Sequence, residues 1–168
     1  MRKNIRYFLL LLGLGILAGI IAKLLDIYST NLGNIFSELS IWILFGVIIT
    51  LFSKSRKFAM IYVFLFCVGM LGGYYVTAEL TSSVYAQNFI IGWTIFSLFS
   101  PVFAYFTWNT KKKDIQGIVI SFGILVVTLM ASIVLFDGPR WYDYVILLTL
   151  AFLLFRKKKI DFKIKDVL

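Results

Sequence analysis

The sequence contains no histidine and a single cysteine, Cys67, among its 168 residues. Without histidine, the commonest metal ligand and the commonest general base are missing. A lone cysteine excludes internal disulfides and thiolate metal sites of the Cys-x-x-Cys type. Zinc-protease, nucleophile-elbow and phosphate-loop motifs are missing as well. We therefore expect no enzymatic activity, no metal and no cofactor, with an enzyme that uses carboxylates alone as the open alternative.

Charged residues are also scarce, at 15% of the chain, whereas hydrophobic residues make up 61% and the mean hydropathy is +0.93. A typical soluble domain is about half apolar and about a quarter charged. Lipid must therefore be the solvent for much of this surface, which indicates an integral membrane protein. In such a protein the net charge of +9 indicates topology and contact with anionic lipid headgroups, and we expect no nucleic-acid partner.

Six apolar segments are long enough, or nearly so, to cross a hydrocarbon layer of about 30 Å as helices. They cover residues 7–25, 35–52, 58–80, 86–108, 116–136 and 139–155. We expect an all-α polytopic fold, with residues 1–168 forming one six-helix transmembrane domain that ends in a short basic tail at 156–168. We interpret the first segment as a retained helix, because its apolar run is long and lacks a small-residue cleavage site.

The positive charges are distributed unevenly between the connections. All basic residues except Lys23 and Arg140 lie in the N-terminus, in the loops 53–57 and 110–114, or in the tail. The intervening connections are neutral or acidic. The positive-inside rule then places both termini in the cytoplasm. We expect a multi-pass protein of a cell membrane, in a bacterium, with its basic loops on anionic headgroups.

Two prolines mark local features. Pro101 should kink the fourth segment, where the hydroxyls of Ser97 and Ser100 are positioned to satisfy the freed backbone. In Asp137-Gly138-Pro139, we expect Asp137 to cap the last helix and the proline to lie in its first turn.

Small residues line one face of the first segment. Gly15, Ala18, Gly19 and Ala22 follow helical spacing and would allow another helix to approach closely. The glycines 69, 72 and 73 give the third segment a similar face. Packing inside the bundle and docking of a membrane protein partner are both compatible with this pattern.

Several ionisable residues fall in the outer part of the predicted membrane layer, where an unpaired charge costs about 2.5–3.5 kcal/mol. We expect Lys23 to pair with Glu38 or Asp143, which lie at similar depth. Such a pair could serve only to fix helix register. Alternatively, an outward-facing polar pocket would bind a small ligand, and its candidate residues are Lys23, Glu38, Trp42, Tyr75, Glu79, Trp93 and Asp143.

The stretch from Leu39-Ser40-Ile41-Trp42 through Gly69-Met70-Leu71-Gly72-Gly73-Tyr74-Tyr75 resembles a family of uncharacterised six-helix bacterial membrane proteins. That resemblance implies the fold and no activity. Ala18-Gly19-Ile20-Ile21-Ala22 is similar to the Ala-x-x-x-Ala face of substrate-binding S components of energy-coupling-factor transporters. This second resemblance implies docking of the first helix on a scaffold subunit, although the loops carry no vitamin-binding signature.

Two functions follow as hypotheses. The first is a non-catalytic module that binds a small ligand from the outer side, as in a transporter. The second is an accessory, regulatory or immunity-type protein that acts by contact with another membrane protein. A ligand binder should have a polar pocket on the outer side, whereas an accessory protein should have the region around Lys23 and Glu38 collapsed and dry.

Overall fold

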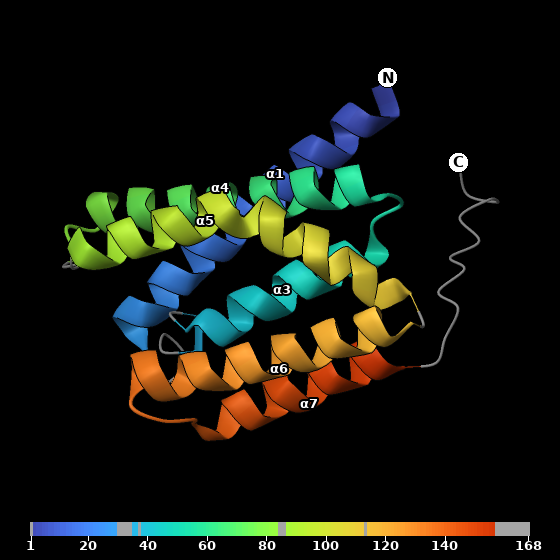
Figure 1. Ribbon diagram of the computed structural model, residues 1–168. Helices are drawn as coiled ribbons and strands as arrows, with labels where there is room; N and C mark the ends of the chain where they lie inside the picture. The colour runs from blue at the N-terminus through green and yellow to red at the C-terminus, as the bar shows by residue number, and fades with distance from the viewer. Residues whose placement is uncertain (1, 30–34, 37, 84–86, 113, 157–168) are drawn as a thin grey trace.

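The computed structural model describes residues 2–29, 35–36, 38–83, 87–112 and 114–156, and this part of the chain is all-helical (Figure 1). Its helices are α1 (Arg2–Tyr28), α3 (Leu39–Phe52), α4 (Arg56–Leu80), α5 (Gln87–Trp108), the short 3₁₀ helix η1 (Asn109–Lys111), α6 (Ile115–Phe136) and α7 (Trp141–Phe155). Four of them, α1, α4, α5 and α6, are long and apolar enough to cross a membrane, while α3 and α7 are shorter apolar helices.

Successive helices run in opposite directions, so the connections gather at two ends of the bundle (Figure 1). At one end, Arg56 donates to the Asn109 side chain at 2.9 Å, and the Lys111 ammonium donates to the Ser53 carbonyl at 2.8 Å. These contacts join the two basic connections. We call this the basic end, and we call the other, where α1 finishes and α7 begins, the opposite end.

Helix α3 lies at the centre of the bundle, with α4 and α5 on one side and α6 and α7 on the other (Figure 1). One group of buried residues, including Trp42 and Met70, joins α3 to α1, α4 and α5. A second group, including Val47 and Leu150, joins α3 to α7. The fold therefore has two packing regions that share one short helix.

Side-chain caps explain where two helices begin. The Ser55 hydroxyl accepts a hydrogen bond from the Phe58 N–H at the start of α4, and the Asp114 carboxylate accepts from the Gly117 N–H at the start of α6. Both satisfy backbone donors that the first turn leaves unpaired.

The connection between α6 and α7 differs from the expectation. Asp137 ends α6 in a left-handed conformation at φ 60°, and Gly138 follows at φ 125°, which glycine adopts without strain. Helix α7 begins only at Trp141, after Pro139, with the Asp143 carboxylate accepting from the Arg140 N–H at 3.0 Å. The capping prediction for Asp137 was therefore wrong, because the acidic residue inside the first turn performs that role.

Helix α5 runs without interruption through Pro101 and changes direction along its length (Figure 1). The expected help from neighbouring serines is absent, since the buried hydroxyls of Ser97 and Ser100 form no hydrogen bond with the described residues. Helix α3 also begins later than expected, at Leu39, so Glu38 precedes its first turn.

Candidate functional site: an apolar chamber beside closed polar clusters

At the opposite end of the bundle, Lys23 has a nearer partner than the ones expected. Its ammonium lies 2.8 Å from the Asp26 carboxylate, one turn along α1, and 5.0 Å from the centre of the Tyr74 ring on α4. The Tyr74 hydroxyl donates to the same Asp26 carboxylate at 2.9 Å. The structure thus pairs Lys23 with Asp26, and the expected pairing with Glu38 or Asp143 was wrong.

Glu38 belongs to a separate cluster that joins the start of α3 to the start of α7. Its carboxylate accepts a hydrogen bond from the Tyr142 hydroxyl at 2.6 Å and lies 3.1 Å from the Arg140 guanidinium. Arg140 also donates to the Tyr142 oxygen at 2.9 Å, and Asp143 caps the backbone of Arg140. We name these four residues the carboxyl cluster.

The carboxyl cluster is closed. Glu38 is 1% exposed and Asp143 is 0% exposed, so bulk water does not reach either carboxyl group. One oxygen of each, Oε2 of Glu38 and Oδ1 of Asp143, has no hydrogen-bond partner among the described residues. Sequence reasoning selected both carboxyls but missed Arg140 and Tyr142, whose only signal was their proximity to Asp143 in the same helical turn.

The remaining predicted ligand-binding residues lie in two other places. Trp42 of α3 stacks on Trp93 of α5 with ring centres 4.7 Å apart. Tyr75 and Glu79, in the last turns of α4, line a shallow groove of about 400 Å³ together with Ile90 of α5. The seven residues therefore do not converge on one outward-facing polar pocket.

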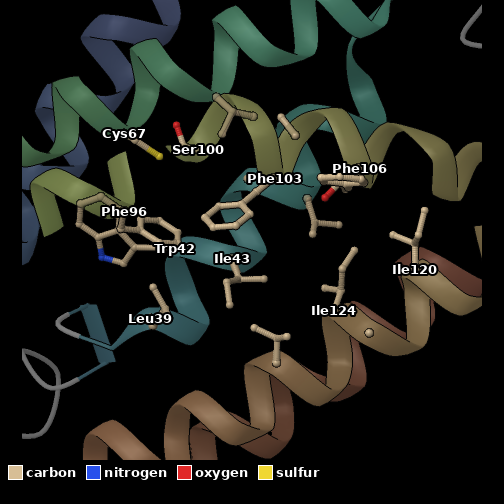
Figure 2. Close-up of a pocket in the computed structure, with 17 residues that line it drawn as sticks. Leu39, Trp42, Ile43, Cys67, Phe96, Ser100, Phe103, Phe106, Ile120 and Ile124 are labelled. Atoms are coloured by element: carbon tan, nitrogen blue, oxygen red, sulfur yellow. The ribbon is translucent and has the colours of Figure 1, made fainter. Parts of the chain in front are cut away.

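A larger hollow lies in the middle of the bundle, between α3, α4, α5 and α6, and Figure 2 shows the side chains that surround it. We call it the apolar chamber. Its volume is about 410 Å³, within the range of about 300–1,000 Å³ that is usual for small-molecule sites. It is lined by Leu39, Trp42, Ile43, Gly46, Val47, Val63, Cys67, Phe96, Ser100, Phe103, Ala104, Phe106, Thr107, Ile120, Gly123, Ile124 and Val127.

The exposure of these lining residues shows how the chamber is oriented. Its inner wall consists of buried residues of α3, α4 and α5, such as Trp42 at 5% and Val63 at 4%. Its rim consists of exposed residues of α5 and α6, such as Phe106 at 51% and Val127 at 54%. The chamber therefore opens on the outer surface of the bundle between α5 and α6.

Polar chemistry inside the chamber is limited to small uncharged groups. The Ser100 hydroxyl lies beside the Cys67 sulfur on the inner wall, as Figure 2 shows, and Thr107 is the last lining residue along α5. The lining residues that the structure describes include neither carboxylates nor ammonium groups. Among the described residues, no group of three acidic or cysteine side chains is placed to hold a metal. This arrangement is suited to holding hydrocarbon and offers no nucleophile with an adjacent base.

Sequence reasoning missed the apolar chamber. Its residues are ordinary hydrophobic ones on four different helices, and hydrophobic side chains are expected throughout a membrane helix. The available signals were Gly46 and Gly123, which leave space on α3 and α6. A Cβ added at Gly123 would meet no atom within 4 Å, and one at Gly46 would meet only Val63 at 3.7 Å.

The small face of α1 is covered by α4. A Cβ at Gly15 would lie 2.3 Å from the Phe66 carbonyl oxygen, and one at Gly19 would lie 2.0 Å from that of Met70. Gly69 and Gly73 of α4 approach the α1 backbone as closely. Ala22 is buried in the same contact region and Ala18 is partly buried. These residues thus support packing within the chain, and a partner could not use this face without displacing α4.

Comparison with known proteins gives one family. No characterised protein and no solved structure matches the chain. Residues 1–159 match the sequence model of a family of unknown function, DUF6518, and because the match covers nearly the whole chain, the protein belongs to that family.

Proposed function

We propose that the protein is a non-catalytic integral membrane protein that binds a small hydrophobic ligand in the apolar chamber. The observation that carries this proposal is a hollow of about 410 Å³ with an apolar lining, in a bundle whose buried Lys23 and Glu38 are paired elsewhere. Empty space of this size between helices loses packing contacts, so an occupant that fills it would stabilise the bundle.

The proposal moves the binding site inward from the outer polar region. Because the carboxyl cluster and the Lys23–Asp26 pair are filled with their own partners, a ligand there would have to break existing ion pairs. A ligand in the apolar chamber would displace nothing charged. Binding, carriage and presentation of a hydrophobic molecule, including a role in transport, are consistent with this position.

The proposal includes a topology. We propose six spans with both termini in the cytoplasm of a bacterial cell, because the basic connections lie together at one end of the bundle and the neutral or acidic ones at the other. The two short helices, α3 and α7, would then cross a thinner part of the layer or use flanking residues as anchors. The basic end would lie on anionic headgroups.

The test is mass spectrometry of the full chain, purified gently from its native membrane. Gly123→Phe should place a ring in the apolar chamber, because Gly123 lines it and a Cβ there would meet no atom within 4 Å. Gly92→Phe is the matched control, since it also has open space and does not line the chamber. A small hydrophobic molecule that co-purifies with the wild type and with Gly92→Phe should be lost from Gly123→Phe. Equal retention by both variants would contradict the proposal.

A second function is supported by the closure of the carboxyl cluster. We expected the region of Lys23 and Glu38 to be collapsed in an accessory protein, and both side chains are buried against neighbouring groups. Such a protein would contact another membrane protein through its lipid-facing surface. Crosslinking in the native membrane distinguishes the two functions, because an accessory protein should give one defined partner that Gly123→Phe does not remove.

A further inference from the structure

We infer that the ligand of the apolar chamber is a single-chain or acyl-chain amphiphile with an anionic head, which enters from the bilayer between α5 and α6. This inference rests on the proposed function and specifies its ligand. Three features of the structure carry it: the shape of the chamber, the position of its opening, and the charge at one of its ends.

The chamber is elongated along the helices. Its lining on α5 extends from Phe96 to Thr107, which corresponds to about 16 Å along the helix axis at about 1.5 Å per residue. Figure 2 shows side chains of α3, α5 and α6 following one another along this length. An apolar slot of this length parallel to the helices can hold an extended hydrocarbon chain, which lies in the same direction within a bilayer.

The opening faces the region where such chains are found. Exposed apolar residues of α5 and α6 form the rim, and they continue the lipid-facing surface of both helices. A chain can therefore move sideways from the bilayer into the slot without passing a polar barrier. A water-soluble ligand would have to cross the same apolar surface to reach the same space.

The basic end of the chamber carries a cation in a suitable place. Lys111 follows Thr107 by four residues and ends the short 3₁₀ helix η1, beyond the end of α5. Its ammonium donates to the Ser53 carbonyl at the end of α3 and lies 3.4 Å from the centre of the Trp108 ring. An ammonium has three donors, so the carbonyl leaves donors available for an anionic head. Lys111 thus bridges two of the helices between which the chamber lies.

The opposite end of the chamber does not offer such a site for an anionic head. Glu38, next to the lining residue Leu39, belongs to the carboxyl cluster, in which the Arg140 guanidinium is already engaged with Glu38 and Tyr142. Two carboxyl groups against one guanidinium would also repel a second anion. The anionic head therefore belongs at the basic end, with the chain directed toward Trp42.

Trp42 provides the assay, because it lines the chamber and is buried from the surrounding lipid. Replacing Trp93, Trp108 and Trp141 with phenylalanine leaves it as the only tryptophan. Chain-brominated probes quench a tryptophan that they contact. The purified full chain is titrated at pH 7, so that the Lys111 ammonium stays charged, with a brominated fatty acid, a brominated anionic phospholipid, and the brominated alcohol of the same chain length. A protein that keeps only Trp141, which is 73% exposed, reports surrounding lipid.

We expect saturable quenching of Trp42 by at least one anionic probe, and which one quenches separates a free acid from a phospholipid. Lys111→Gln should weaken binding of that probe about fivefold, as expected for one basic residue near a headgroup, and leave binding of the alcohol unchanged. Arg6→Gln, which removes a charge from α1, is the control and should have no effect. Glutamine keeps an N–H for the Ser53 carbonyl, so this variant should fold.

Two results overturn different statements. If acid and alcohol quench Trp42 equally and Lys111→Gln changes neither, the chamber holds a neutral chain and the inference on charge fails while the proposed function stands. If no probe quenches Trp42, or if Gly123→Phe leaves quenching unchanged while Trp141 is quenched, only surrounding lipid is detected. The proposed function then fails as well.

Discussion

The close contact between α1 and α4 gives a sharp prediction for Gly19. In water-soluble helices, replacing an interior glycine with alanine gains about 1 kcal/mol, because alanine loses less backbone freedom. At Gly19 the added Cβ would lie 2.0 Å from the Met70 carbonyl oxygen and 2.7 Å from the Tyr74 nitrogen. Both atoms belong to the backbone of α4, so no side-chain rotation can relieve the overlap.

The helices must therefore separate, and overpacking of this kind costs about 1–3 kcal/mol or more. Gly19→Ala should lower the free energy of unfolding by at least about 2 kcal/mol. Gly13→Ala is the matched control on the same helix, because its Cβ would meet no atom within 4 Å. It should be neutral or slightly stabilising.

The measurement is reversible unfolding of the purified protein in mixed micelles with increasing denaturing detergent. The informative quantity is the difference in the free energy of unfolding between Gly19→Ala and Gly13→Ala, because both variants share the same change in helix propensity. Equal stability of Gly19→Ala and Gly13→Ala would refute the α1–α4 contact. It would also restore the alternative that this face of α1 is available to a partner.

Three further predictions concern the carboxyl cluster and the topology. Tyr142→Phe should cost about 1–3 kcal/mol in the same unfolding assay, because Glu38 loses its buried hydrogen bond, whereas Tyr144→Phe, at an exposed position, should be neutral. In a Glu38→Leu background the loss caused by Tyr142→Phe should shrink, because no buried acceptor is then left unpaired, and an unchanged loss would contradict the bond. For topology, a cysteine at Gly138 should react with an impermeant thiol reagent added to intact cells, and one at Ser55 should not. Labelling at Ser55 would contradict cytoplasmic basic loops.

The extent of the helices was largely predictable, because hydropathy reports length and composition directly. The errors lie at helix ends. Glu38 was assigned to the second span on hydropathy, yet it lies just before α3, which begins at Leu39. The last segment was expected to start at Pro139, and α7 begins at Trp141. Hydropathy averages over a window and does not register which carboxylate caps a turn.

The pairing of charges was less predictable, because depth along a helix does not specify direction around it. Lys23, Glu38 and Asp143 lie in neighbouring parts of the sequence-predicted layer, and this similarity suggested one cluster. The structure divides them, with Lys23 facing α4 and Glu38 facing α7. Asp26 and Arg140, the partners that the structure shows, were not among the residues expected to pair. Long side chains reach across the boundary of the membrane layer, so residues at different depths can still pair.

Helix α3 connects the carboxyl cluster to the apolar chamber. Glu38 is held to α7 by the Tyr142 hydroxyl, and the next residue, Leu39, lines the chamber. Trp42 follows one turn later and forms part of the inner wall. A shift of α3 away from α7 would therefore move the whole α3 side of the chamber. The carboxyl cluster can thus affect ligand binding without touching the ligand, because it fixes the position of the short helix on which the chamber depends. Loss of binding in a cluster variant must then be read together with its stability, since a direct contact and a displaced α3 predict the same loss.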